Sequence, residues 1–238
     1  MDIHRPKPFH GVREFLKEYG IIVLGVLTAL GAEQAVENFH HRERVEIGEQ
    51  ALKDDFFNYI QYHAQLLAET PCRDARLTEL RAIVDDGARL GVLGEVGPFS
   101  HPSVQPWEIA SWETMVASQA AVYVPQEKVA RYARIAHWAK DTHLAGQSEF
   151  DAWAILVGLS GPSRHFGDAE QASLRAAIER ASYSARLMRI ITQATEDEMV
   201  QSGLLTSAEL DAARDKGVHR KYEETCKPIV YTPAAVKK

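Results

Sequence analysis

The chain lacks most of the features that identify a function directly. Only two of its 238 residues are cysteines, Cys72 and Cys226, which is too few for a disulfide-rich scaffold, and they lack the Cys-x-x-Cys spacing of zinc and redox sites. Lysine and arginine are scattered among a larger number of acidic residues, and the net charge is −6, so the basic patch of a nucleic-acid-binding protein is missing. We find no low-complexity tract, internal repeat or catalytic motif, and we expect no nucleic-acid partner.

An uncharged apolar run lies near the N-terminus, from Tyr19 to Ala32. As a helix, this run covers about 21 Å of a hydrocarbon layer about 30 Å thick, and apolar neighbours on both sides lengthen it. The run is apolar on every face, whereas a helix packed on a soluble core keeps a polar stripe. We therefore predict a transmembrane helix at 19–36. Two alternatives stay open: a core helix of a soluble protein, and a cleaved signal peptide with Ala29 and Gly31 as its small residues.

Basic residues are more numerous before the apolar run than just after it. The first group is Arg5, Lys7, Arg13 and Lys17, and the second is Arg42 and Arg44. This asymmetry predicts that segment 1–18 is cytoplasmic and that the rest of the chain lies outside. In a bacterium, the protein is then a single-pass inner-membrane protein with a periplasmic domain. Its first partner is the lipid bilayer, and the residues expected at the headgroups are His40, His41, Arg42 and Arg44.

Small residues recur at helical spacing within the run, at Gly25, Ala29 and Ala32. Such residues allow a second membrane helix to approach closely, so they are candidate contacts with another copy or another membrane protein. Just after the run, Glu37 and His40 have the Glu-x-x-His spacing of di-iron bundles, but the sequence contains no second such pair. We therefore predict no metal site, no cofactor and no catalytic residue.

The remaining sequence shows helical periodicity throughout and no sustained strand pattern. No proline occurs between Pro8 and Pro71, so one helix is predicted from Val12 to Glu69. Its second half carries a coiled-coil-like seam of Val45, Leu52, Phe56, Tyr59, His63 and Leu66. Further helices are predicted at Thr70–Leu90 with Thr70 as N-cap, Trp107–Ala121, Pro125–Leu159, Asp168–Ser202 with Asp168 in a capping box, and a short one opened by Thr206.

These elements predict an all-α fold, in which an N-terminal transmembrane helix continues into a stalk and an antiparallel helical bundle. The bundle is expected at 37–217, followed by an extended C-terminal tail at 218–238. If the bundle is periplasmic, Cys72 and Cys226 are in an oxidising environment with no other partner in the chain. We therefore predict a disulfide between them.

Parts of the sequence resemble an uncharacterised family of bacterial proteins with a single N-terminal membrane helix. The similarity is carried by REFLKEYGIIVLGVLTALGAEQAVE and by ALKDDF within Val12–Phe57. It extends to the Cys72-x-x-x-Arg76-Leu77 segment and to Trp112–Ser118. The resemblance implies a membrane topology and no particular activity.

We therefore expect a membrane-anchored helical scaffold, sensor or accessory subunit rather than an enzyme. The first alternative is an enzyme whose site is assembled from distant residues, for example around His101, Trp112 and His143. The second is a soluble helical protein in which the apolar run is a core helix.

Overall fold

The computed structural model describes residues 11–102, 109–218 and 224–234, and its fold is all-α, as predicted. The described residues form six α-helices and one 3-10 helix: α1 (Val12–Ala68), α2 (Thr70–Leu90), α3 (Ser111–Ala117), η1 (Ala120–Tyr123), α4 (Gln126–Val157), α5 (Asp168–Gln201) and α6 (Ser207–Val218). Three predicted features lie partly outside the described residues. They are the cytoplasmic segment (1–10), the start of the helix at Trp107, and the tail (219–223 and 235–238).

The chain divides into two compact units, Met1–Ile47 and Gly48–Lys238. The first unit contains the predicted transmembrane segment 19–36 and also the residues that follow it up to Ile47. In this unit the described chain is helical from Val12 onward, as part of α1. The second unit contains the last third of α1 and all the other helices.

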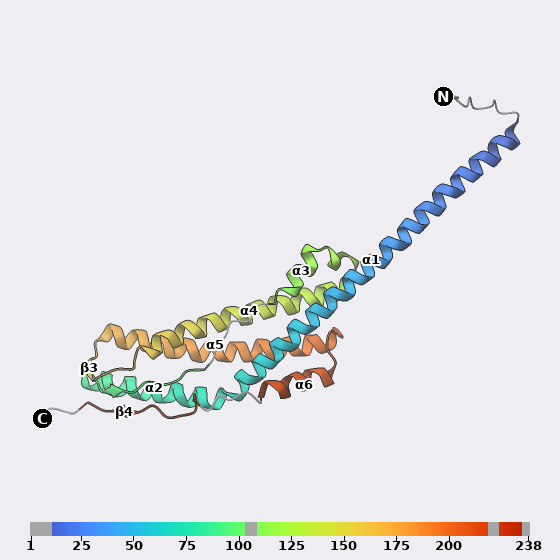
Figure 1. Cartoon of the computed structure of the whole chain (residues 1–238). Coiled ribbons are helices and arrows are strands. Elements are labelled where there is room, and N and C mark those ends of the chain that lie inside the picture. Colours follow the sequence, from blue (N-terminus) through green and yellow to red (C-terminus); the bar gives the residue numbers. More distant parts are fainter. Residues whose placement is uncertain (1–10, 103–108, 219–223, 235–238) are drawn as a thin grey trace, which may run out of the picture. The chain divides into compact units, whose positions relative to one another are not determined.

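The second unit is a helical bundle (Figure 1). Helices α4 and α5 lie side by side in opposite directions, and α2 packs against α5. A continuous apolar cluster forms between them, and its members include Trp153, Phe166, Leu80, Leu93, Leu156, Leu159 and Ile178. Five of the six residues of the predicted seam on α1 face the interior of this unit, since Leu52, Phe56, Tyr59, His63 and Leu66 are all buried. The sixth, Val45, is half-buried and belongs to the first unit.

Among the residues that the structure describes, four two-residue strands accompany the helices, although no strand pattern is visible in the sequence. Strand β1 (Val92–Leu93) pairs with β3 (Arg164–His165), and β2 (Glu95–Val96) pairs with β4 (Tyr231–Thr232), both antiparallel. A side chain at Gly94 would collide with the backbone of the tail at Thr232, so the close approach requires glycine there. The segment after α2 thus holds both the α4–α5 turn and the C-terminal tail.

Two of the predicted helix caps are wrong. Helix α2 begins at Thr70, but its N-cap is Glu69, which makes no side-chain cap. The Thr70 hydroxyl instead donates a hydrogen bond back to the Leu66 carbonyl at 3.3 Å, because α1 ends at Ala68, with only Glu69 between the two helices. Asp168 is likewise the first residue of α5 rather than its cap, which is Gly167.

The third predicted helix is also shorter than expected. Within the described residues, α3 ends at Ala117 and Gln119 adopts a left-handed conformation with φ of 60°, which separates α3 from η1. The predicted start of the last helix is confirmed. The Thr206 amide donates to the Glu209 carboxylate at 2.9 Å, and the Glu209 amide donates to the Thr206 hydroxyl at 3.2 Å, a reciprocal capping box.

Candidate functional site

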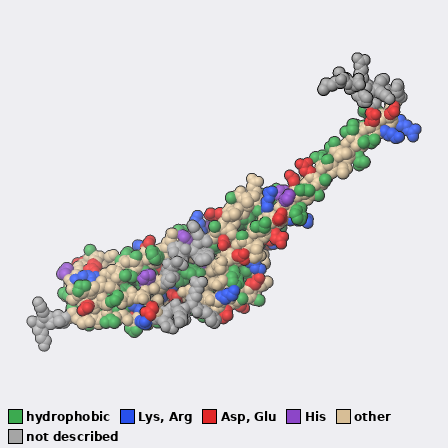
Figure 2. All heavy atoms as spheres, in the orientation of Figure 1, with side chains coloured by type: hydrophobic (Ala, Val, Ile, Leu, Met, Phe, Trp, Pro, Cys, Tyr) green, Lys and Arg blue, Asp and Glu red, His purple; other side chains and the backbone are tan. Residues whose placement is uncertain are grey.

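The apolar part of α1 carries its hydrophobic side chains on the surface. An 18-residue window of this helix is long and apolar enough to cross a membrane, and none of the window is buried. Figure 2 shows hydrophobic side chains along this segment. Its largest exposed members are Tyr19, Ile21, Ile22, Leu24, Val26, Leu27 and Leu30. The predicted contact residues Gly25, Ala29 and Ala32 belong to the same exposed stretch.

The residues predicted at the lipid headgroups follow directly on the same helix. Arg42 and Arg44 are exposed, and His41 is half-buried. The Nδ1 atom of His40 lies 3.7 Å from a carboxylate oxygen of Glu43, one turn further on. In the described part of the chain, no group of three or more histidine, cysteine, aspartate or glutamate side chains could hold a metal ion.

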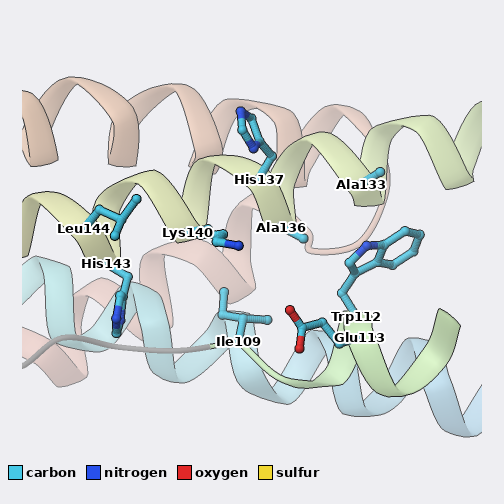
Figure 3. A pocket seen from close by; sticks show the side chains of 9 residues that line it. All are labelled: Ile109, Trp112, Glu113, Ala133, Ala136, His137, Lys140, His143 and Leu144. Carbon is cyan, nitrogen blue, oxygen red and sulfur yellow. The ribbon is translucent and has the colours of Figure 1, made fainter. Parts of the chain in front are cut away.

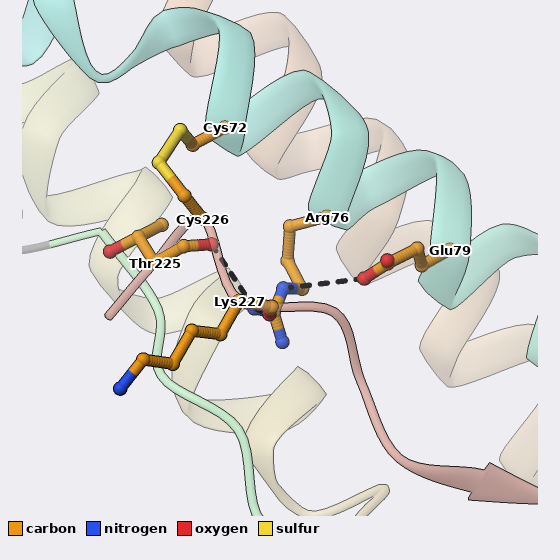
Figure 4. The surroundings of a disulfide bond; sticks show 6 residues. All are labelled: Cys72, Arg76, Glu79, Thr225, Cys226 and Lys227. Atoms are coloured by element: carbon orange, nitrogen blue, oxygen red, sulfur yellow. Dashed lines mark hydrogen bonds and ion pairs between the residues drawn. A yellow bond between two sulfur atoms is a disulfide. The ribbon is translucent and has the colours of Figure 1, made fainter. Parts of the chain in front are cut away.

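A disulfide joins Cys72 near the start of α2 to Cys226 in the tail, with their Cα atoms 4.7 Å apart (Figure 4). One turn along α2, the buried Arg76 donates hydrogen bonds to the carbonyls of Thr225, at 3.1 Å, and Lys227. Burial lowers the pKa of Arg76, and the carboxylate of Glu79, 3.6 Å away, partly offsets this effect. The tail is therefore attached to α2 both covalently and by a buried cation.

A second buried charge pair lies where α1 passes into α2. The Arg73 Nε atom is 3.3 Å from Glu149 Oε1, and both side chains are almost completely buried. Burial raises the pKa of Glu149, while the charge of Arg73 and a hydrogen bond donated by Trp153 Nε1 at 3.1 Å lower it. The nearby buried Glu69 carboxylate raises it further. Two carboxylates and one guanidinium thus share a dry region, which fixes α4 to the α1–α2 junction.

Further buried polar side chains lie along α1. The Tyr59 hydroxyl donates to the Thr142 hydroxyl at 3.1 Å, and it also contacts the Thr192 hydroxyl at 3.4 Å. The His63 ring lies 4.2 Å from the Tyr59 ring. Burial lowers the pKa of His63 to about 3, and the positive charge of Arg73 adds to the effect. His63 is therefore a neutral, structural histidine rather than a proton carrier at ordinary pH.

A pocket of about 370 Å³ opens between α4 and the segment around α3 (Figure 3). The α3 side contributes Ile109, Trp112 and Glu113, and the α4 side contributes Ala133, Ala136, His137, Lys140, His143 and Leu144. The α4 residues recur at steps of three and four, so they lie on one face of the helix. This volume is within the usual range for small-molecule sites, which are mostly apolar with a few polar groups.

The structure brings together two of the three residues proposed for a site of distant residues. Trp112 and His143 both line the pocket, whereas the ring of His101 stacks on Trp153, with centroids 6.2 Å apart. Glu113 and Lys140 also line the pocket, but no motif in the sequence singles them out. Nothing in the sequence indicates that the segment around α3 covers this face of α4.

No protein-family model, curated protein or solved structure matches this chain. Its proposed function therefore rests on its own residues and their geometry.

Proposed function

We propose that this chain is a membrane-anchored helical module whose bundle lies outside the cytoplasm and serves as a scaffold, sensor or accessory subunit. The observation that carries the proposal is the exposed apolar segment of α1, none of which is buried. The span 19–36 is about 27 Å long at the rise of an α-helix, close to the thickness of a hydrocarbon layer.

The apolar side chains of this segment are stabilised when something other than water covers them. Each large aliphatic side chain left in water costs roughly 1.5 to 3 kcal/mol relative to burial, and this segment exposes at least six of them. A partner protein covers one stripe of a helix and leaves a polar stripe facing water. The segment has no polar stripe. A bilayer surrounds a helix on all sides, so it covers these side chains more completely than a partner protein does.

Two further observations support a bundle on the outside. Basic residues are more numerous before the span than just after it, which favours a cytoplasmic N-terminus. The disulfide between Cys72 and Cys226 is of a kind that persists in oxidising compartments such as the periplasm and is rare in the cytosol. The charge bias and the disulfide are independent observations, and both favour a bundle outside the cytoplasm.

Membrane fractionation with an alkaline wash tests the anchor. We expect the full chain to stay with the membrane, because a spanning helix is not released by disrupting electrostatic contacts. A double variant with Leu24→Asp and Leu27→Asp should appear in the wash, since charges at the centre of a span oppose insertion. The matched variant with alanine at both positions should remain with the membrane. Release of the unaltered chain by the wash would contradict the proposal.

The pocket favours a sensor among the three roles. A scaffold or a passive accessory subunit needs only an outer surface, whereas the α3–α4 pocket has an apolar floor and charged side chains on both walls. Binding of a small molecule there would give the anchored bundle a signal to report.

A further inference from the structure

The hollow between α3 and α4 arises from the choice of residues on α4. Ala133 and Ala136 are the smallest side chains that line it from α4, and their methyl groups leave space that longer side chains would fill. Trp112 closes one end, where its ring packs edge-on against Tyr132 with centroids 6.5 Å apart. Ile109 adds an apolar wall from the α3 side (Figure 3). The result is an open pocket with an apolar floor and one aromatic wall.

Two opposite charges face this pocket from different elements. Glu113 belongs to α3 and Lys140 to α4, and both side chains line the hollow (Figure 3). Across the part of the chain that the structure describes, neither side chain makes a hydrogen bond or an ion pair. His137, in contrast, already lies 3.6 Å from the carboxylate of Asp141 on its own helix. The pocket therefore offers one carboxylate and one ammonium group to a ligand.

We propose that this pocket binds a small zwitterion with an apolar side chain, of the amino-acid or dipeptide class. Its ammonium group faces Glu113, its carboxylate faces Lys140, and its apolar side chain lies against Trp112 and Ile109. This inference goes beyond the proposed membrane anchorage and does not depend on it.

Charge balance selects this class over simpler ions. A ligand with only a carboxylate satisfies Lys140 but brings a like charge close to Glu113, and a ligand with only an ammonium group does the reverse at Lys140. Like charges in one site disfavour binding, and the partly apolar pocket strengthens both attraction and repulsion. A zwitterion pairs both groups at once. The Trp112 ring offers a face for an aromatic or branched side chain.

Isothermal titration of the full chain in lipid nanodiscs tests the proposal. The zwitterionic probes are phenylalanine, leucine and alanyl-phenylalanine, so that the free amino acids and the dipeptide are compared directly. The single-charge probes are hydrocinnamate, which lacks the ammonium group, and phenethylamine, which lacks the carboxylate. Empty nanodiscs measure partitioning of the probes into lipid. We expect at least one zwitterion to bind about tenfold more tightly than either single-charge probe, because each charge-assisted contact contributes about that factor.

Two variants assign each charge to its partner. Glu113→Gln should weaken the zwitterion about tenfold and leave hydrocinnamate as tight or tighter, because only the ammonium contact is lost. Lys140→Met should weaken the zwitterion similarly while sparing phenethylamine. Exposed charges elsewhere in the bundle provide matched controls, Asp151→Asn on α4 and Arg180→Gln on α5, and these should change nothing. All four positions are on the surface, so the variants are expected to fold.

Three results would overturn the proposal. The first is that none of the three zwitterions binds at millimolar concentration. The second is that hydrocinnamate or phenethylamine binds as tightly as the best zwitterion, which would make the pocket a simple ion site. The third is that Asp151→Asn or Arg180→Gln weakens binding as much as the pocket variants, which would place the site elsewhere.

Discussion

The buried His63 makes the stability of the bundle depend on pH in a defined direction. Its side chain is 4% exposed, and its ring packs between those of Tyr59 and Tyr62. Burial, with a contribution from the charge of Arg73, lowers its pKa to about 3. In the unfolded chain the same imidazole has a pKa of about 6.5. Between about pH 3 and pH 6.5, the His63 imidazole is therefore neutral in the folded protein and protonated in the unfolded chain.

The direction and the size of the pH effect on stability follow from this difference in pKa. Because the folded pKa is depressed, the contribution of His63 is fully present above about pH 6.5 and is lost as the pH falls toward 3. Each pH unit in this window costs about 1.4 kcal/mol of unfolding free energy for one proton. Between pH 6.5 and 5, His63 should thus remove about 2 kcal/mol. The raised pKa values of Glu149 and Glu196 act oppositely, since their contribution is present at low pH and is lost as the pH rises.

A comparison of variants separates the pH dependence of stability due to His63 from that due to these carboxylates. Urea unfolding of the full chain in mild detergent, followed by circular dichroism, gives the unfolding free energy at several pH values from 7 to 5. His63→Gln should be less stable than the unaltered chain at pH 7, and we expect this difference in unfolding free energy to narrow by about 2 kcal/mol by pH 5. His165→Gln, at an exposed histidine, is the control and should show no narrowing. A gap for His63→Gln that stays constant with pH would refute the reasoning.

Three further changes test the packing. Leu52→Asp should unfold the bundle, because Leu52 is fully buried and an unpaired buried charge costs several kcal/mol; circular dichroism checks this, and a folded monomer released from an oligomer would contradict it. Replacing Cys72 and Cys226 with serine should lower the unfolding free energy by up to about 5 kcal/mol, measured in urea, whereas free thiols in the unaltered chain would remove this expectation. Arg73→Met should cost about 3 to 5 kcal/mol and the added Glu149→Leu should recover most of it; strictly additive losses would argue against the pair.

Helical periodicity and the positions of helix-breaking residues were enough to predict much of the fold. The absence of proline between Pro8 and Pro71 predicted the length of α1, which ends at Ala68, within one residue of the expected Glu69. The spacing of Leu52, Phe56 and Tyr59 predicted the buried face of the same helix correctly. These features are local, because each depends on the side chains of one segment and on a fixed helical repeat.

The predictions that were wrong or missing concern features that depend on contacts between distant segments. Thr70 has the residue type of an N-cap, but the end of α1 immediately before it gives its hydroxyl a different acceptor. The strands β2 and β4 pair residues more than a hundred positions apart and have no alternating pattern of their own. The contact of Arg73 with Glu149 is likewise invisible in the sequence, where both residues resemble ordinary surface charges.

The residues of the candidate pocket also differ in how far the sequence predicts them. His137 and His143 are six residues apart, a spacing that points to different faces of a helix, yet both line the pocket, because its lining spans a wide face of α4. The position of Trp112 and Glu113 opposite them depends on tertiary contacts of α3, which no local pattern specifies. Of the lining residues, the sequence singled out only Trp112 and His143, and the tertiary structure provides the rest.

We propose that one helix spans the membrane and places the bundle on the oxidising side. A topology reporter fused after Lys238 in a bacterial host tests this most directly, with one enzyme that is active only in the periplasm and one fluorescent protein that folds only in the cytoplasm. The account predicts enzyme activity from the first fusion and no fluorescence from the second. Fluorescence from the second fusion, with no activity from the first, would place the bundle in the cytoplasm and contradict the account.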